Sequence, residues 1–340
     1  MTALPDGDPA TFLDRVRMLA EIALREWELD VISVQPIKVR ENAVFRLDLA
    51  NAGHAALRVH RLGYHSDSAL RSEFAWMEAL GRAGIDVPKV IPSRHGNPFE
   101  LAVCSGLDGA RQIDVFQWIE GRQLGVSGDA VQSDAKTVSS QYFTIGAIMA
   151  RMHNQATTWP LPAGFVRHSW DSEGLVGAAP LWGPFWELEA LSPGQRELMQ
   201  RIRAVVSREL AAYGRGADRF GLIHADLVPE NVLVDGANVR VIDFDDAGFG
   251  WHLFDIATSL YFLTPDSVYP LARDALLRGY RSGRALSEDA VGRLPLLMAA
   301  RATTYLGWVH TRQGTETARE LTPFLVDLAC STAEDCLRSL

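Results

Sequence analysis

Apolar residues recur at helical spacing at the start of the chain and at strand spacing soon afterwards. Within residues 9–28 they fall three or four positions apart, at Phe12, Val16, Leu19, Ala23 and Trp27. This spacing predicts an amphipathic helix, and the preceding Asp8–Pro9 pair favours a helix start, with Asp8 as the cap and Pro9 in the first turn. From residue 31 the period changes to two, which predicts short strands.

The next hundred residues are predicted to form a mainly antiparallel sheet with one helix. Three strands come first, in the segments VISVQPIKV (31–39), AVFRLDL (43–49) and AALRVHR (55–61). An amphipathic helix over about residues 66–83 follows, with Gly84 as its C-terminal cap. Three further segments complete the sheet, namely VPKVI (87–91), FELAV (99–103) and QIDVFQWI (112–119).

Beyond the segment EGRQLG at 120–125 the pattern is mostly helical. Helices are predicted over about 138–157, over 193–213, and as four helices between 252 and 338. The exceptions are a loop rich in Trp, Pro and Gly at 158–187 and two short strands, VLV and VRVID, joined by the turn DGAN. The chain is therefore predicted to be α+β, with a small β lobe (1–119), a hinge (120–125), a larger helical lobe (126–340) and a ligand cleft between the lobes.

Composition and charge narrow the possible functions. The 340 residues carry a net charge of -9, which argues against nucleic acid or an anionic membrane as the main partner. The three cysteines, Cys104, Cys330 and Cys336, form neither a C-x-x-C pair nor a disulfide framework. The first 18 residues lack the pattern of a signal peptide, and no apolar run approaches the ~20 residues that span a bilayer. A cytoplasmic protein without a membrane partner is predicted.

Polar residues with catalytic potential are concentrated in LIHADLVPENVLV, residues 222–234. Apolar segments flank His224, Asp226 and Asn231, so a loop between buried segments presents them. The strand VRVI then ends in Asp243. One Asp that accepts a proton, with an Asn and a second Asp as oxygen ligands for magnesium, suits phosphoryl transfer. Each residue alone could be explained by the preference of Asp and Asn for turns, but that preference does not explain their combined spacing.

The motif HADLVPENVL…VIDFDD resembles the catalytic and metal-binding loops of the aminoglycoside phosphotransferase family. That family has a protein-kinase-like fold and includes choline kinases, type II homoserine kinases and stress response kinase A. The resemblance extends over about residues 31–310 in the order of elements and is most specific at 224–243. It implies a two-lobe kinase-like fold, ATP and Mg²⁺ as cofactors, and a small molecule with a hydroxyl group as the phosphate acceptor.

The resemblance also assigns roles within the second lobe. It implies that Asp226 is the catalytic base and that Asn231 and Asp243 bind magnesium. His224 would brace the loop, and Asp255 would be the buried aspartate that ties the loop to the helical lobe. The acids that follow, Asp245 and Asp246, are either contacts to a second ion or turn residues.

In the first lobe, the resemblance implies an ATP site built around Arg58. Arg58 occupies the position of the kinase lysine that grips the phosphates, and Glu73 on the following helix is its partner; the alternative is an ordinary surface salt bridge. The segment VRENAVFR (39–46) takes the place of the phosphate-covering loop without any glycine, so contacts from Glu41 to Phe45 must differ, with Asn42 as a candidate contact. The Gln117 carbonyl and Ile119 amide would contact adenine.

The acceptor is expected on the helical lobe, where two groups of residues are candidates. Trp170, Trp182 and Trp186 could form an aromatic wall, or could simply pin a long loop to the core. Arg301, Tyr305 and Trp308 share a helix face, and Arg301 either binds an acidic acceptor or pairs with a surface acid.

Three functions fit the sequence. The first is an ATP-dependent phosphotransferase acting on a hydroxyl of an aminoglycoside, an amino alcohol or a homoserine-like acceptor. The second is a serine/threonine protein kinase similar to stress response kinase A, although no A-P-E segment is present. The third is a non-catalytic nucleotide-binding protein, which Arg58 and the glycine-free segment favour. Ala225, Val228 and Asp245 depart from the residues usual in the family, but none of these changes removes a catalytic group.

Overall fold

The computed structural model describes residues 9–39 and 42–340, so Asp8 and Glu41, for which a helix cap and a nucleotide contact were considered, lie outside the described residues. Contacts between residues divide the chain into two compact units. Unit 1 runs to Glu120 and also contains Leu161–Val166, and unit 2 contains Gly121–Pro160 and Arg167–Leu340. One contact that holds residues 161–166 in unit 1 is a hydrogen bond from the Val166 N–H to Ser72 Oγ at 2.9 Å.

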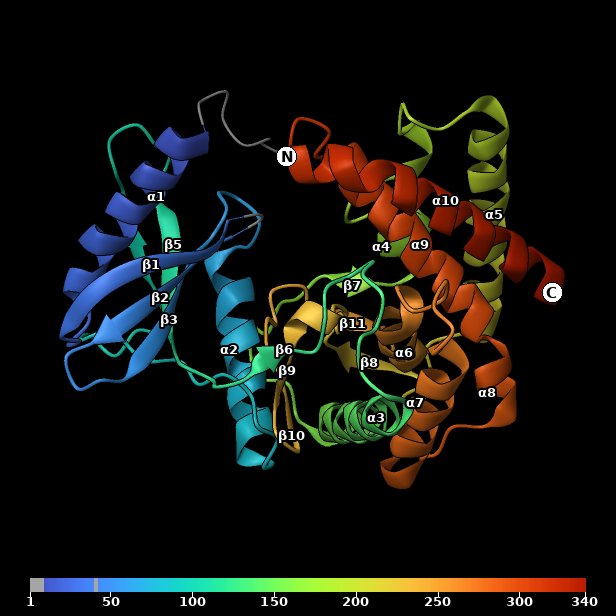
Figure 1. Cartoon of the computed structure of the whole chain (residues 1–340), viewed down its shortest axis with the longest axis horizontal. Helices are drawn as coiled ribbons and strands as arrows, with labels where there is room; N and C mark the ends of the chain where they lie inside the picture. Colours follow the sequence, from blue (N-terminus) through green and yellow to red (C-terminus); the bar gives the residue numbers. More distant parts are fainter. Residues whose placement is uncertain (1–8, 40–41) are drawn as a thin grey trace. The chain divides into compact units, whose positions relative to one another are not determined.

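Unit 1 is built on a five-stranded antiparallel sheet with the strand order β1-β2-β3-β5-β4 (Figure 1). The strands are β1 (Val31–Val39), β2 (Ala43–Leu49), β3 (His54–Val59), β4 (Glu100–Ala102) and β5 (Arg111–Gln117). The helices are α1 (Pro9–Ala23), the 3₁₀ turn η1 (Leu24–Glu26) and α2 (Asp67–Arg82). The antiparallel sheet predicted from the period-two pattern is confirmed.

The core of unit 1 lies between α1 and one face of the sheet. The apolar stripe of α1 and inward-facing residues of β2, β3 and β5 form one buried cluster. It includes Val16 and Leu19 of the helix and Phe45, Leu57 and Val115 of the sheet. Burying each large side chain of this kind contributes roughly 1.5–3 kcal/mol. This packing fixes which face of each strand points inward, and therefore where the polar residues of β3 and β5 lie.

Two boundaries in unit 1 were predicted wrongly. Residues 87–91 were predicted as a strand, but only an isolated bridge between Val90 and Phe116 forms there. Pro88 has no backbone N–H to donate, and proline inside a segment disfavours a continuous ladder. The first helix is also shorter than predicted, because α1 ends at Ala23 and passes into η1.

Unit 2 is mainly helical and contains two small sheets. Its helices are α3 (Ala135–Thr158), α4 (Ser172–Val176), α5 (Pro193–Tyr213), α6 (His252–Tyr261), α7 (Tyr269–Gly283), α8 (Glu288–Gly292), α9 (Leu294–His310) and α10 (Glu316–Ser339), with 3₁₀ turns η2 (Phe185–Glu187) and η3 (Pro229–Asn231). Its strands are β6 (Arg122–Gln123), β7 (Ser169–Trp170), β8 (Phe220–Ile223), β9 (Val232–Asp235), β10 (Asn238–Val241) and β11 (Gly248–Trp251). They form the sheets β10-β9-β6 and β7-β11-β8.

Several of these elements differ from the prediction. The loop predicted over 158–187 contains β7, α4 and η2, and the segment 252–338 holds the short α8 in addition to the four predicted helices. Elements this short carry too few residues to show a period in sequence. Among the described residues, no helix combines the length and the apolar character that crossing a bilayer requires.

The middle of unit 2 is formed by helices that are buried on nearly every side. All ten residues of α6 and most of α9 are buried. The helices α3 and α7 lie side by side at very close range (Figure 1). Gly146 and Gly279 permit this approach, because a Cβ on Gly146 would lie 2.1 Å from the Leu276 carbonyl oxygen and one on Gly279 would lie 1.9 Å from the Phe143 carbonyl oxygen. This rigid group of helices carries the loop between β8 and β9.

Candidate active site

The carboxylate of Asp226 is held from two sides within unit 2. Arg301 Nη2 donates to Asp226 Oδ1 at 2.7 Å, and Asn231 Nδ2 donates to Asp226 Oδ2 at 2.7 Å. The Asp226 side chain retains 20% exposure, whereas Arg301 and Asn231 are buried. Two predicted site residues, Asp226 and Asn231, are thus brought together at a carboxylate that stays partly accessible.

Ile242 connects this loop to Asp243. Its N–H donates to the Asn231 carbonyl at 2.9 Å, and its own carbonyl lies 3.1 Å from His224 Nε2. On the other side of the ring, the Asp226 N–H donates to His224 Nδ1 at 3.3 Å. His224 therefore fits the neutral form with the proton on Nε2, and burial lowers the pKa of His224, which favours that form. The ring braces the loop, as the resemblance implies.

Asp243 and Ala225 both adopt backbone conformations that are rare for residues with a side chain. Their φ angles are +66° and +65°. Such left-handed positions are sparsely populated and persist where surrounding contacts hold them. At Ala225, the family's usual glycine would adopt this angle more easily. Asp243 is exposed and directly follows Ile242, the residue whose backbone contacts both Asn231 and His224.

Asp255, in the first turn of α6, binds the backbone of the catalytic loop. Its carboxylate accepts the backbone N–H groups of His224 at 3.0 Å and Ala225 at 2.6 Å. His153 Nε2 lies 3.0 Å from the same carboxylate, and His153 Nδ1 lies 2.9 Å from the hydroxyl of Tyr280. Burial raises the pKa of Asp255 and lowers that of His153 to about 3. A neutral His153 thus links α3 and α7 to the loop, a connection that sequence reasoning missed.

The donor set fits a hard divalent cation. Asn231 uses its amide nitrogen on Asp226, so its amide oxygen is not consumed by that contact. Together with the Asp243 carboxylate it offers oxygen ligands, which magnesium prefers. The loop after Asp243 is held by Arg167, whose guanidinium donates to the carbonyls of Phe244, Asp245 and Ala247.

The aromatic residues predicted near the acceptor mostly serve packing. Trp170 is fully buried and donates its ring N–H to the Asp246 carbonyl at 2.8 Å, so it pins the loop after β10. Trp186 is covered by the Arg203 guanidinium, 3.6 Å from the ring centroid. Trp182 packs instead against α9, where its ring centroid lies 5.8 Å from that of Tyr305. Trp308 stays partly exposed on α9, with the Arg312 guanidinium 5.1 Å from its ring centroid.

Arg301 does neither of the things that were predicted for it. It is fully buried and its partner is Asp226, so it neither pairs with a surface acid nor faces solvent as a binding group. The helical pattern of α9 placed Arg301 correctly on one face with Tyr305, and Arg301 Nη2 donates to the Tyr305 hydroxyl at 2.6 Å. A buried arginine in an apolar helix was the signal available in sequence, because such a charge requires a partner.

In unit 1, Arg58 joins two carboxylates in the buried part of the structure. Arg58 Nη2 lies 2.8 Å from Glu73 and 2.9 Å from Asp114, and Arg58 Nε also donates to Asp114. Arg58 and Asp114 are opposed residues of β3 and β5. His60 Nε2 lies 2.6 Å from Asp114 Oδ2. Burial raises the pKa of Asp114, but Arg58 and His60 outweigh this and hold it below its usual value.

The predicted pair of Arg58 and Glu73 therefore exists, and it is buried rather than a surface salt bridge. Sequence reasoning missed Asp114, although the antiparallel register of the two strands pairs it with Arg58.

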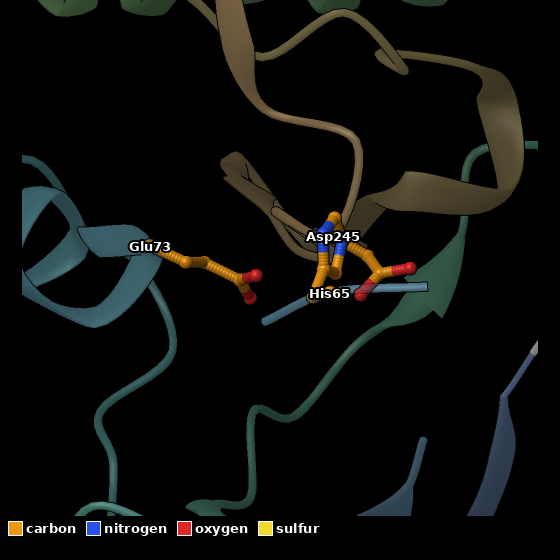
Figure 2. A group of neighbouring side chains, drawn as sticks. All are labelled: His65, Glu73 and Asp245. Carbon is orange, nitrogen blue, oxygen red and sulfur yellow. The ribbon is translucent and has the colours of Figure 1, made fainter. Parts of the chain in front are cut away.

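Figure 2 shows Glu73 on α2, His65 in the segment before α2, and Asp245 in the loop after β10. Glu73 and His65 belong to unit 1, and Asp245 belongs to unit 2.

The remaining predicted nucleotide contacts lie at the edges of the unit 1 sheet. Asn42 precedes β2, and its side-chain oxygen accepts the backbone N–H of Arg61 at 3.1 Å, so it closes the turn end of the sheet. Gln117 ends β5, with its N–H donated to the Lys89 carbonyl at 2.8 Å. Ile119 follows in an irregular segment and is half-buried. Their roles towards ATP stay predictions.

Comparison with known proteins identifies the class of protein. The model of the phosphotransferase enzyme family matches residues 33–290. The chain belongs to this family, and it is a phosphotransferase of the kinase type that acts on alcohol groups. The protein-kinase-like α+β fold predicted from sequence is confirmed.

Individual relatives are similar over much of the chain. A solved structure of a microcompartment-associated aminopropanol kinase superimposes with a TM-score of 0.82 and 30% identity, over 95% of this chain and 98% of that one. Amicoumacin kinase of Bacillus subtilis (strain 168) is 27% identical over 248 residues, 72% of this chain and 67% of that protein. A homoserine kinase of Acidiphilium cryptum (strain JF-5) is 34% identical over 178 residues, about half of each chain.

Proposed function

We propose that this protein transfers the γ-phosphate of Mg-ATP to a hydroxyl group of a small amino alcohol. The observation that carries the proposal is the arrangement around Asp226. An accessible carboxylate is fixed by Asn231 and Arg301, and it lies on a loop that Ile242 ties to Asp243. A base beside two oxygen ligands for magnesium is the set that phosphoryl transfer to an alcohol uses.

Asp226 acts on the acceptor in this mechanism. Its accessible oxygens accept the hydrogen bond of the acceptor hydroxyl, which aligns the attacking oxygen, and the carboxylate takes the proton late in the transfer. His224 and Asp255 hold the loop so that this orientation is present before the acceptor arrives. Asn231 and Asp243 would hold magnesium, which neutralises charge on the phosphate oxygens when it is bound.

Arg58 is the candidate group for the ATP phosphates in unit 1. It carries a permanent positive charge, and its guanidinium is oriented by Glu73 on one side and Asp114 on the other. This arrangement supports retention of nucleotide binding although lysine is replaced, and it weakens the hypothesis of an inert scaffold. The absence of glycine from the segment at 39–46 does not remove any of these contacts.

The amino alcohol as acceptor class is supported by the relatives. The structure with 30% identity and nearly complete mutual coverage is described as an aminopropanol kinase, and a further relative as a homoserine kinase. Aminopropanol and homoserine both carry an amine and a hydroxyl group on a short carbon chain. The net charge of -9 also favours cationic over anionic small molecules at long range.

A panel of acceptors tests the proposal. Aminopropanol, ethanolamine, choline, homoserine and spectinomycin would each be incubated with Mg-ATP, and ADP release would be followed together with the ³¹P spectrum of the product. We expect acceptor-dependent ADP release and a phosphate monoester with at least one amino alcohol. Transfer to a protein such as casein, with no amino alcohol phosphorylated, would contradict the proposal.

A further inference from the structure

Arg301 is the only Arg, Lys, Asp or Glu in α9, and it lies at the centre of that helix. Its side chain has 0% exposure. An isolated charge in such a place is strongly unfavourable, so its contacts must compensate for the loss of hydration. They are a carboxylate, a backbone carbonyl and a phenol: Asp226 Oδ1 at 2.7 Å, Ala225 O at 3.2 Å and the Tyr305 hydroxyl at 2.6 Å.

Aromatic rings hold the guanidinium in place. Its central carbon lies 4.3 Å from the ring centroid of Tyr305, 4.9 Å from that of Trp182 and 5.7 Å from that of Phe254. Such cation–π contacts strengthen when water is excluded. The guanidinium therefore has one orientation, in which one edge points to the catalytic loop and contacts Ala225 and Asp226 together.

We infer that Arg301 is a positioning residue for the reaction, because it holds the Asp226 carboxylate in the orientation that meets the acceptor hydroxyl. This inference rests on the proposed function of Asp226. One Asp226 oxygen is bonded to Arg301 and the other to Asn231, so the carboxylate is held from both sides. An aspartate held in this way accepts the substrate hydrogen bond in a single geometry.

Two substitutions separate the charge of Arg301 from its shape. Arg301→Gln retains a hydrogen-bond donor but loses both the charge and the planar fork that contacts Asp226 and Ala225 together, so kcat should fall while the KM for ATP changes little. Arg301→Lys keeps the charge but not the fork. We expect its kcat to fall by less than that of Arg301→Gln. Displacement of the base by about 1 Å can cost roughly 100-fold in rate.

Arg203→Gln is the matched control. Arg203 also stacks on a tryptophan, Trp186, and donates to the backbone carbonyls of Val176 and Gly177, which lie outside the catalytic loop. Its loss should lower thermal stability without lowering kcat. Mg-ATP binding, measured by calorimetry, should be retained in all three variants, which shows that each is folded.

Kinetics then distinguish the inference from the proposed function. With an amino alcohol from the panel, we expect Arg301→Gln to lower kcat far more than it changes the KM for ATP. If Asp226→Asn abolishes turnover but Arg301→Gln retains the wild-type kcat, the inference about Arg301 fails alone. If Asp226→Asn itself keeps turnover, the proposed function of the site fails.

Discussion

Replacing Asp114 by Asn tests whether the buried charge cluster of unit 1 is as strongly coupled as its geometry indicates. Asp114 has no exposed surface, and its two oxygens receive Arg58 Nε at 3.2 Å, Arg58 Nη2 at 2.9 Å and His60 Nε2 at 2.6 Å. Asparagine keeps the size but removes the charge and turns an amide N–H₂ towards two donor groups. The guanidinium of Arg58 then keeps the carboxylate of Glu73 as its partner on α2.

The magnitude follows from burial. Removing one partner of a buried ion pair typically costs about 3–5 kcal/mol, and the remaining contact of Arg58 with Glu73 places Asp114→Asn near the lower end. We therefore expect the free energy of unfolding to fall by about 3 kcal/mol at pH 7. The pKa of Asp114 is lowered in the folded protein, so this contribution is present above the unfolded value of 3.8 and is lost as the pH falls through the folded value.

Urea unfolding followed by near-UV circular dichroism at pH 7 measures this difference. Glu78→Gln is the control, because Glu78 forms an exposed pair with Arg82 in the same unit and its loss should cost less than about 1 kcal/mol. A loss below about 1 kcal/mol in Asp114→Asn, or a loss equal to that of the control, would refute the reasoning that the cluster is a tightly coupled buried network.

Three other parts of the structure also give testable expectations. Arg58→Ala should abolish the rise in melting temperature that Mg-ATP causes in the wild type, as measured by differential scanning fluorimetry; an unchanged rise would show that the phosphates bind elsewhere. Gly146→Ala should destabilise unit 2 by at least ~1–3 kcal/mol in urea, because its Cβ would meet a backbone carbonyl of α7 at 2.1 Å, while Gly81→Ala, with open space around it, should be neutral or stabilising. Burial lowers the pKa of His153 to about 3 and of His252 to about 2, so below pH 6.5 both histidines bind protons in the unfolded chain but not in the folded one. Each histidine should therefore lower the free energy of unfolding by about 1.4 kcal/mol between pH 7.5 and 5.5, and His252→Gln should reduce that loss.

The sequence was most informative where function depends on residues that are close along the chain. Asp226 and Asn231 are five residues apart, and one short hairpin brings Asp243 back beside them, so their spacing alone indicates phosphoryl-transfer chemistry. The antiparallel sheet of unit 1 was predictable for a similar reason. Alternation of buried and partly buried residues, clearest in β2, is a local pattern that burial on one face imposes.

Long-range partners could not be predicted in the same way. Arg301 lies 75 positions from Asp226, and Asp114 lies 56 positions from Arg58. Only the packing of α9 against the catalytic loop, and the register between β3 and β5, bring these charges together. His153 reaches Asp255 across 102 positions for the same reason. Sequence could show that each of these polar residues lay in an apolar segment, but not which partner satisfied it.

If Asp226 is the general base while Asn231 and Asp243 hold magnesium, then loss of Asp226 and loss of Asp243 must have different consequences. Turnover of an amino alcohol and Mg-ATP affinity would be measured for Asp226→Asn and Asp243→Asn. General-base contributions are typically ~100- to 10,000-fold. We expect Asp226→Asn to lose that much turnover with little change in Mg-ATP affinity, and Asp243→Asn to weaken both. Near-normal turnover in Asp226→Asn would contradict the account.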